Sequence, residues 1–155
     1  KGILLHGGHG TRLRPLTHTG PKQLLPIANK PMSEYCIESM KDAGVTEIAI
    51  IVGGIGSNKV REYYGDGEKF NVNITYVKQD EPLGISHAIN LCRSFIGDDK
   101  FLVFLGDNII VSFGRSEFSL IILLFIIDKS LESTFAILNL FNRLIKFTSV
   151  CLKIY

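Results

Sequence analysis

A glycine-rich stretch near the start of the chain constrains the fold most, because it directly follows a short apolar run. Residues 3–5 (Ile-Leu-Leu) are typical of a short buried strand, and residues 7–10 contain three glycines. Glycine lets the backbone bend sharply and approach a ligand closely, and successive free N–H groups in such a turn form a concavity for anions. One hydroxyl and three cations follow: Thr11, Arg12, Arg14 and Lys22. The stretch therefore suits phosphate groups.

Two well-known phosphate loops do not fit this stretch. It is not a Walker A loop, because no Gly-Lys-Ser/Thr closes it, and it is not the dinucleotide fingerprint, because Leu13 stands where that motif has its third glycine. The glycines alone leave open a solvated turn with scattered cations, and this alternative applies to Arg14 in particular. The whole string from Gly7 to Pro15, with Pro21 and Lys22 behind it, is more specific.

Five ordered blocks within residues 2–110 resemble the sugar-1-phosphate nucleotidylyltransferases, and among these the glucose-1-phosphate thymidylyltransferases most closely. The blocks are the string from Gly7 to Pro15 and residues 21–26, 29–32, 79–84 and 105–108. One position departs from the family pattern, which usually has Ala where this chain has His6. We expect the larger side chain to crowd the neighbourhood of the base pocket.

The resemblance implies transfer of a nucleotidyl group from dTTP to glucose 1-phosphate, giving dTDP-glucose and pyrophosphate, with UTP and another sugar 1-phosphate as the alternative pair. Because two anions must meet, such a site needs cations and N–H donors more than it needs a base. By resemblance, Arg12 neutralises the leaving pyrophosphate and Lys22 sits between the phosphates of the two substrates. The loop residues that would cradle the triphosphate are Gly7, Gly8, Gly10 and Thr11.

Two further sites follow from the resemblance. Asp107 matches the family's Mg²⁺-binding Asp, although a lone Asp after a strand is often a turn former or a helix cap. Gln79 and Gly84 would recognise the base, since an amide offers a donor and an acceptor and glycine lets the backbone approach. Without the resemblance, Gln79 would be interpreted as an exposed strand end. The four histidines do not cluster at metal-ligand spacing.

Hydrophobic periodicity predicts an α/β layered fold with a mainly parallel sheet, and the resemblance implies a Rossmann-like three-layer α/β/α arrangement. Such sheets bind ligands at the carboxyl ends of their strands, where the glycine loop and Asp107 both fall. The expected strands are residues 3–5, 48–52, 72–77 and 101–105. The expected helices run from Pro31 to Gly44, from Ser57, as the capping residue, to Tyr64, and from Gly84 to Phe95.

The chain changes character near residue 112, which predicts a nucleotide-binding half at 1–112 and a divergent tail at 113–155 packing on or completing the same domain. The tail contains one glycine and no proline, and Phe, Leu and Ile supply 21 of its 43 residues. It is either a divergent ending that completes the sheet or the product of a frameshift or truncation, and the scarcity of turn residues favours the second. The family's later Glu-Lys-Pro motif and second metal-binding Asp have no counterpart here, so we expect a truncated sheet and impaired catalysis.

Composition and charge restrict the partners and the compartment. The net charge of +2 is interspersed along the chain, which does not indicate a nucleic-acid surface. The apolar run Phe118 to Ile127 has ten residues, fewer than the roughly 20 of a membrane span, and predicts instead an exposed patch and a homo-oligomer. Cys36, Cys92 and Cys151 are far apart, as reduced thiols of a cytoplasmic protein would be.

Two function classes remain open at this stage. The first is an active nucleotidylyltransferase, perhaps completed by another chain. The second is a non-catalytic nucleotide-binding domain or a decayed gene product. The chain begins at Lys1 and has no signal-peptide pattern, so we expect a start that is processed or lies further upstream.

Overall fold

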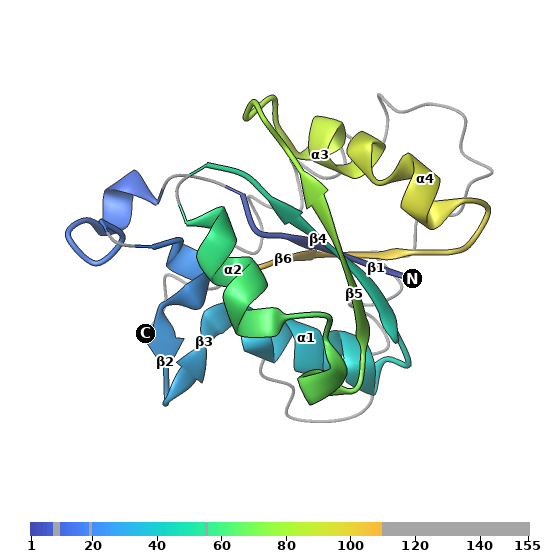
Figure 1. Cartoon of the computed structure of the whole chain (residues 1–155), viewed down its shortest axis with the longest axis horizontal. Coiled ribbons are helices and arrows are strands. Elements are labelled where there is room, and N and C mark those ends of the chain that lie inside the picture. The colour runs from blue at the N-terminus through green and yellow to red at the C-terminus, as the bar shows by residue number, and fades with distance from the viewer. Residues whose placement is uncertain (8–9, 19, 55, 110–155) are drawn as a thin grey trace, which may run out of the picture.

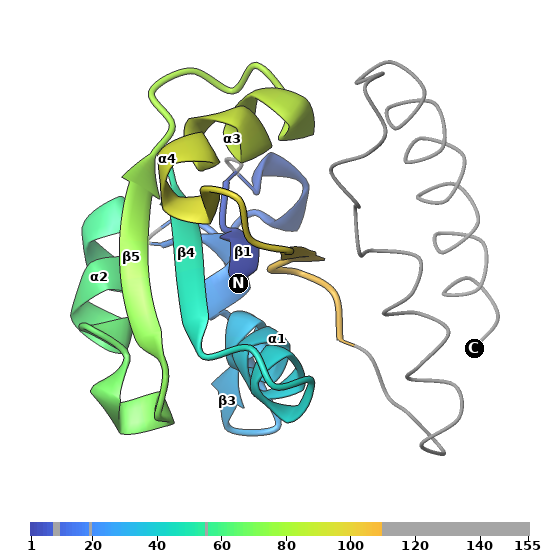
Figure 2. The ribbon, with the colours of Figure 1, turned by 90° about the vertical axis from the view of Figure 1, so that its right-hand side faces the viewer.

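A parallel four-stranded sheet forms the centre of the computed structural model, which describes residues 1–7, 10–18, 20–54 and 56–109. The strand order is β5-β4-β1-β6, and β5, β4 and β1 run side by side (Figure 2). The strands are β1 (Gly2–Leu5), β4 (Glu47–Val52), β5 (Asn73–Lys78) and β6 (Leu102–Leu105). The predicted α/β fold with a parallel sheet is confirmed. A separate antiparallel pair, β2 (Pro26–Ile27) and β3 (Lys30–Pro31), was not predicted.

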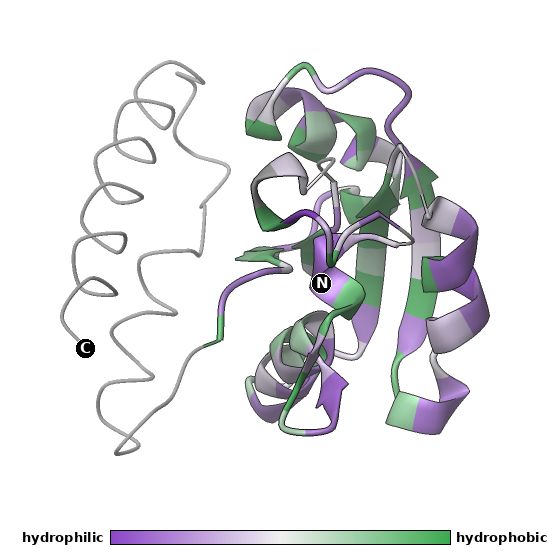
Figure 3. Ribbon diagram, turned by 90° about the vertical axis from the view of Figure 1, so that its left-hand side faces the viewer, coloured by the Kyte–Doolittle hydropathy of each residue, from purple (hydrophilic) through white to green (hydrophobic). Residues whose placement is uncertain are grey.

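In the part of the chain that the structure describes, four helices cover both faces of this sheet (Figure 1). One face packs against α1 (Met32–Asp42) and α2 (Ser57–Tyr64), and the other packs against α3 (Ile85–Leu91) and α4 (Arg93–Ile96). Three short 3-10 turns complete the described elements: η1 (Thr11–Leu13), η2 (Lys22–Leu24) and η3 (Glu68–Phe70). Because helices cover both faces, the inner strands β1 and β4 are hydrophobic along almost their whole length, whereas the edge strand β5 mixes polar and hydrophobic residues (Figure 3).

Successive residues of β1 pack into two separate hydrophobic cores. Leu4 points into the layer of α1 and α2, whereas Ile3 and Leu5 point into the layer of α3 and α4. Each layer contains one buried free cysteine, Cys36 in the first and Cys92 in the second, and burial raises the pKa of Cys36 to about 12 and that of Cys92 to about 11. The prediction of buried thiols is confirmed for these two, and Cys151 lies outside the described residues.

Two helical predictions need correction. The helix expected from Gly84 to Phe95 is divided at Cys92, whose N–H bonds to the carbonyl of Ile89, three residues back, at 3.0 Å. Ser57 does not cap its helix: Gly56, in the left-handed conformation, takes the N-cap position. The Ser57 hydroxyl instead donates to the carbonyl of Gly54 at 2.9 Å.

The predicted domain boundary near residue 112 and the apolar tail lie outside the described residues. Among the helices that the structure describes, none is both long and apolar enough to span a membrane.

Candidate nucleotide-binding site at the carboxyl edge of the sheet

The predicted site residues gather where the parallel strands end. Of these residues, Gly7 follows β1, Gln79 follows β5 and Asp107 follows β6, and Gly53, which was not predicted, follows β4. Their backbones are tied to the neighbouring strands: the Gln79 N–H donates to the Val52 carbonyl at 2.9 Å. Residues that are up to 100 positions apart in sequence therefore meet at one edge, as expected for an α/β sheet.

The glycine loop closes back on the segment that carries Lys22. Gly10 has φ of +58°, and a Cβ on it would lie 2.9 Å from Thr17 Cγ2 and 3.4 Å from Lys22 Cβ. The buried Thr17 donates its hydroxyl hydrogen to the Gly10 carbonyl at 2.7 Å. Only glycine can occupy this position without strain, so this turn sets the position of the segment that carries Lys22.

Among the described residues, the other loop positions show no contact to a phosphate-binding group. Thr11 and Arg14 are exposed, and Arg12 lies in η1, the turn that follows Gly10. The Arg12 side chain and all of Gly8 are outside the part of the chain that the structure describes. Their predicted phosphate contacts stay predictions.

Lys22 and Asp107 form an ion pair across the edge of the sheet. Lys22 opens η2 and Asp107 follows β6, and their side chains are 27% and 33% exposed. Both groups are thus reachable from solvent but partly sheltered. Within the described residues, no group of three or more His, Cys, Asp or Glu side chains stands close enough to enclose a metal ion. Asp107 is therefore a single carboxylate beside a cation.

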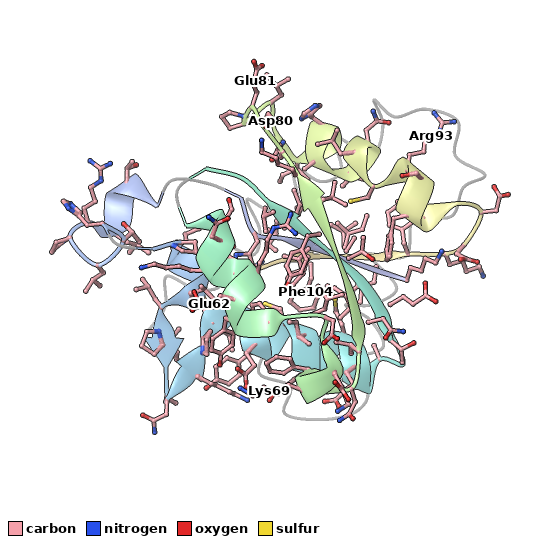
Figure 4. All side chains as sticks on the ribbon, in the orientation of Figure 1. Glu62, Lys69, Asp80, Glu81, Arg93 and Phe104 are labelled. Carbon is pink, nitrogen blue, oxygen red and sulfur yellow. The ribbon has the colours of Figure 1, made fainter. Side chains whose placement is uncertain are left out.

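Gln79 and Gly84, the predicted base-reading pair, are in direct contact. The Gln79 side-chain nitrogen donates to the Gly84 carbonyl at 3.3 Å and lies 3.1 Å from His87 Nδ1. A Cβ placed on Gly7 would lie 3.5 Å from Gln79 Oε1, so the amide borders the glycine loop. The loop between Gln79 and Gly84 projects into solvent with its acidic residues, Asp80 and Glu81, at the tip (Figure 4).

His6 is the main correction at this site. It was expected to crowd the base pocket, but its ring turns into the layer of α1 and α2, where it is 2% exposed. Its Nε2 lies 2.8 Å from the hydroxyl oxygen of Ser33, and its ring meets Tyr64 edge-on. Burial lowers its pKa to about 4, although the charge of Asp107 acts in the opposite direction.

A buried hydrogen-bond network around Ser33 escaped the sequence analysis. The Ser33 hydroxyl donates to the Gln23 carbonyl at 3.0 Å, which leaves its oxygen to accept from Tyr64 at 2.6 Å and from His6. Gln23 in turn donates its side-chain N–H to the Gly7 carbonyl at 3.0 Å. The network joins the glycine loop, η2, α1 and α2. Its only sequence signal is polar residues among apolar neighbours, which is too common to be specific.

A hollow elsewhere on the surface does not belong to this site. It lies at the opposite edge of the sheet, where β5 begins, and carries two acids and no cation. Its lining residues are Thr46, Asp66, Glu68, Asn71, Val72 and Asn73. That lining does not suit phosphate groups.

The fold and this edge together define an α/β domain that carries a glycine loop beside a Lys–Asp pair at the carboxyl ends of its strands. Comparison with known families makes the assignment more specific: the model of the family described as Nucleotidyl transferase matches residues 1–138, and the chain belongs to that family. The sugar-1-phosphate nucleotidylyltransferase resemblance seen in the sequence is thereby confirmed at the level of the family.

Two curated relatives show the same relationship. The low-salt glycan biosynthesis nucleotidyltransferase Agl11 of Haloferax volcanii is 54% identical over 110 residues, which are 71% of this chain and 31% of that protein. A glucose-1-phosphate thymidylyltransferase of Streptomyces antibioticus is 48% identical over 111 residues, 72% of this chain and 31% of that protein. The chain therefore spans about a third of the length of the curated relatives it matches.

Solved structures agree with the fold. A protein described as a glucose-1-phosphate thymidylyltransferase from Bacillus anthracis, in complex with sucrose, gives a TM-score of 0.71 at 39% identity. That match covers 78% of this chain and 49% of the other. A UDP-glucose pyrophosphorylase complexed with UDP-glucose gives 0.66 at 29% identity, covering 79% of this chain and 51% of the other.

Proposed function

We propose that this chain binds a nucleoside triphosphate and forms the donor side of a sugar-1-phosphate nucleotidyl transfer site. The proposed substrates are dTTP and glucose 1-phosphate, with UTP as the alternative nucleotide. The observation that carries the proposal is the Lys22–Asp107 pair, which stands beside the glycine loop at the carboxyl edge of the sheet. The names of the relatives support both nucleotides, since one is a thymidylyltransferase and another is a UDP-glucose pyrophosphorylase.

The chemistry needs charge neutralisation more than proton transfer. A phosphate oxygen of the sugar phosphate attacks the α-phosphorus, the bond from that phosphorus to the bridging oxygen breaks, and pyrophosphate leaves with the electron pair. No proton has to move, so positioning and cations supply the catalysis. In this proposal Lys22 stands between the two reacting phosphates, Arg12 neutralises the pyrophosphate, and the loop N–H groups of Gly7, Gly8, Gly10 and Thr11 bind the triphosphate.

Asp107 is the residue that would hold Mg²⁺. Mg²⁺ is commonly bound by one or two carboxylates together with phosphate oxygens and water, and one partly exposed carboxylate at the phosphate edge fits that pattern. When bound, the ion would withdraw charge from the phosphates. With a triphosphate present, Lys22 would exchange part of its contact with Asp107 for phosphate oxygens, which suits an ammonium group that makes several contacts.

The acceptor side is the weaker half of the proposal. The chain aligns with 31% of the length of the Haloferax relative. The sugar-phosphate contacts expected from the resemblance have no counterpart in the sequence of this chain. Correct positioning of two substrates is worth roughly 7–11 kcal/mol of barrier, so losing those contacts should slow turnover far more than it weakens nucleotide binding. We place the reaction in the cytoplasm, which the reduced buried thiols support.

Two measurements on one sample test this function. Calorimetric titration with dTTP and with UTP, in the presence of Mg²⁺, should show binding. Pyrophosphate release with glucose 1-phosphate should then be slow compared with a full-length relative. Binding without any release would identify a non-catalytic nucleotide-binding domain, and absence of binding to both nucleotides would reject the proposal.

A further inference from the structure

The side chain of Gln79 is held at one end by two neighbours. Its nitrogen donates to the carbonyl of Gly84, the N-cap of α3, at 3.3 Å. The same nitrogen lies 3.1 Å from Nδ1 of His87, in α3. Its oxygen is on the other side, near Gly7, where an added Cβ would be 3.5 Å away. The amide thus spans the gap between α3 and the glycine loop.

The hydrogen-bonding chemistry of Gln79, Gly84 and His87 decides which atoms donate and which accept. An amide nitrogen carries two hydrogens and cannot accept, so both of its neighbours must be acceptors. The Gly84 carbonyl always is one, and it also accepts the Ala88 N–H at 3.2 Å in the first turn of α3. His87 must therefore leave Nδ1 bare and carry its proton on Nε2. Two acceptors at one end of the amide then fix the oxygen at the other end.

Gly84 contributes to this arrangement through its backbone. Its φ of +97° and ψ of 178° belong to a region that essentially only glycine occupies, and this conformation turns its carbonyl toward Gln79. A terminal carboxamide otherwise rotates easily, because its last torsion is broad and roughly two-fold. Without His87, the amide would keep one acceptor of two and lose much of its preference for one orientation.

We propose that His87 is a positioning residue that locks the Gln79 amide with its oxygen toward the nucleotide, and so selects bases that present an N–H. Thymine and uracil present an imide N–H to such an acceptor, whereas the matching ring nitrogen of cytosine is itself an acceptor. The locked amide therefore favours dTTP and UTP and disfavours dCTP. This inference rests on the proposed function, because it assumes that Gln79 faces the base.

The test compares dTTP with dCTP by calorimetry on the whole chain. His87→Phe keeps an aromatic ring but removes the acceptor, and we expect its dTTP affinity to fall roughly 3- to 10-fold, the value of one such hydrogen bond. Its dCTP affinity should stay the same or rise, so the dTTP/dCTP ratio collapses. His87→Asn, whose side-chain oxygen can take the place of Nδ1, should restore most of the ratio. Asn90→Ala, an exposed change on the same helix, is the matched control and should change neither affinity.

Two readouts separate this inference from the function it rests on. Nitrogen NMR of the His87 ring should show the proton on Nε2, and a proton on Nδ1 would overturn the lock whatever the chain binds. If dTTP binds and His87→Phe leaves the dTTP/dCTP ratio unchanged, only the role of His87 fails. If the unaltered chain binds no nucleotide, the proposed function and the base selection fail together. A parallel loss of both affinities in His87→Phe would show a merely structural role.

Discussion

At the residue scale, the Lys22–Asp107 ion pair should contribute little to stability and, in the proposed function, much to catalysis. Partly exposed ion pairs contribute up to about 1 kcal/mol to stability, because water screens them and both side chains lose freedom. A cation that faces developing charge in a transition state is worth much more. The role that we propose for the pair is therefore functional rather than structural, and substitutions can separate the two contributions.

We expect Lys22→Ala to lower any pyrophosphate release by about 10²- to 10³-fold, the usual effect of removing one transition-state contact. The free energy of unfolding should change by less than about 1 kcal/mol. Lys41→Ala, an exposed lysine near the end of α1, is the control and should leave the rate unchanged. A weakened dTTP affinity with a normal rate would contradict the position of Lys22 between the phosphates.

His6 should make the stability depend on pH. Its pKa is 6.5 when solvated and about 4 in the folded chain, so between these values the unfolded chain binds the extra proton. Stability is thus fully present above pH 6.5 and is lost as the pH falls toward 4, by about 3 kcal/mol from this group. Urea unfolding from pH 7 to pH 4 measures this loss.

A comparison of two histidine variants assigns that pH dependence. His6→Gln retains a hydrogen-bond donor toward Ser33 but does not titrate, so its profile should be flatter than that of the unaltered chain. His18→Ala removes an exposed histidine and should leave the profile unchanged. Equal profiles for His6→Gln and the unaltered chain would show that His6 is not responsible.

At the element scale, Ser33 joins α1 to η2, to α2 and to His6, the residue after β1, through one hydroxyl group. We expect Ser33→Ala to cost about 1–3 kcal/mol of unfolding free energy, because it leaves buried groups of Gln23, Tyr64 and His6 without their partner. Ser39→Ala is the matched control, since its hydroxyl donates to the Tyr35 carbonyl of its own helix at 2.8 Å. Equal stability of the two in urea unfolding would argue against the network.

The close packing of Gly53, after β4, against Gln79, after β5, should make the stability equally sensitive to substitution. A Cβ on Gly53 would lie 2.5 Å from the backbone oxygen of Gln79, so Gly53→Ala must move the strand end that carries the amide. We expect a cost of about 1–3 kcal/mol and a weaker dTTP affinity. Among the described residues, the atom nearest to a Cβ on Gly20 would be Lys59 Cδ, 3.8 Å away, and Gly20→Ala should be tolerated. Thermal unfolding and calorimetry on both variants measure the difference, and a Gly53→Ala chain with unaltered stability would contradict this packing.

Strands β4 and β6 could be predicted from the sequence, because a strand that is buried on both faces leaves a continuous apolar run. Residues 48–52 and 101–105 are such runs, and each matches a strand to within a residue. The break at Cys92 could not be predicted, because a single change from an i−4 to an i−3 hydrogen bond leaves no mark on hydrophobic periodicity.

The candidate site was predictable to the extent that its residues lie in recognisable blocks. Lys22 and Asp107 belong to different blocks, and the parallel sheet explains why they meet. The inward turn of His6 was not predictable, since it depends on the partners Ser33 and Tyr64, which lie 27 and 58 positions away and show no local pattern. Long-range polar contacts of this kind appear only in three dimensions.

At the scale of the whole molecule, the tail supplies the last prediction. Phe118 to Ile127 has one polar member in ten residues, and a contiguous apolar patch of that kind promotes association. We expect light scattering to show a mass above that of one chain, falling when Leu123 and Leu124 are both changed to Lys. The double change Asp128→Asn and Glu132→Gln raises the net charge by the same two units next to the run and controls for charge alone. A stable single chain at high concentration would reject this prediction.

The position of β1 has a consequence for how the chain is made. It is the first strand in the sequence, yet it lies in the middle of the described sheet, between β4 and β6. On the ribosome its apolar residues emerge long before either neighbour, and non-local pairing of this kind is slow and leaves exposed segments prone to aggregation. The part of the sheet that is synthesised first is therefore completed last, after Leu105 has left the exit tunnel.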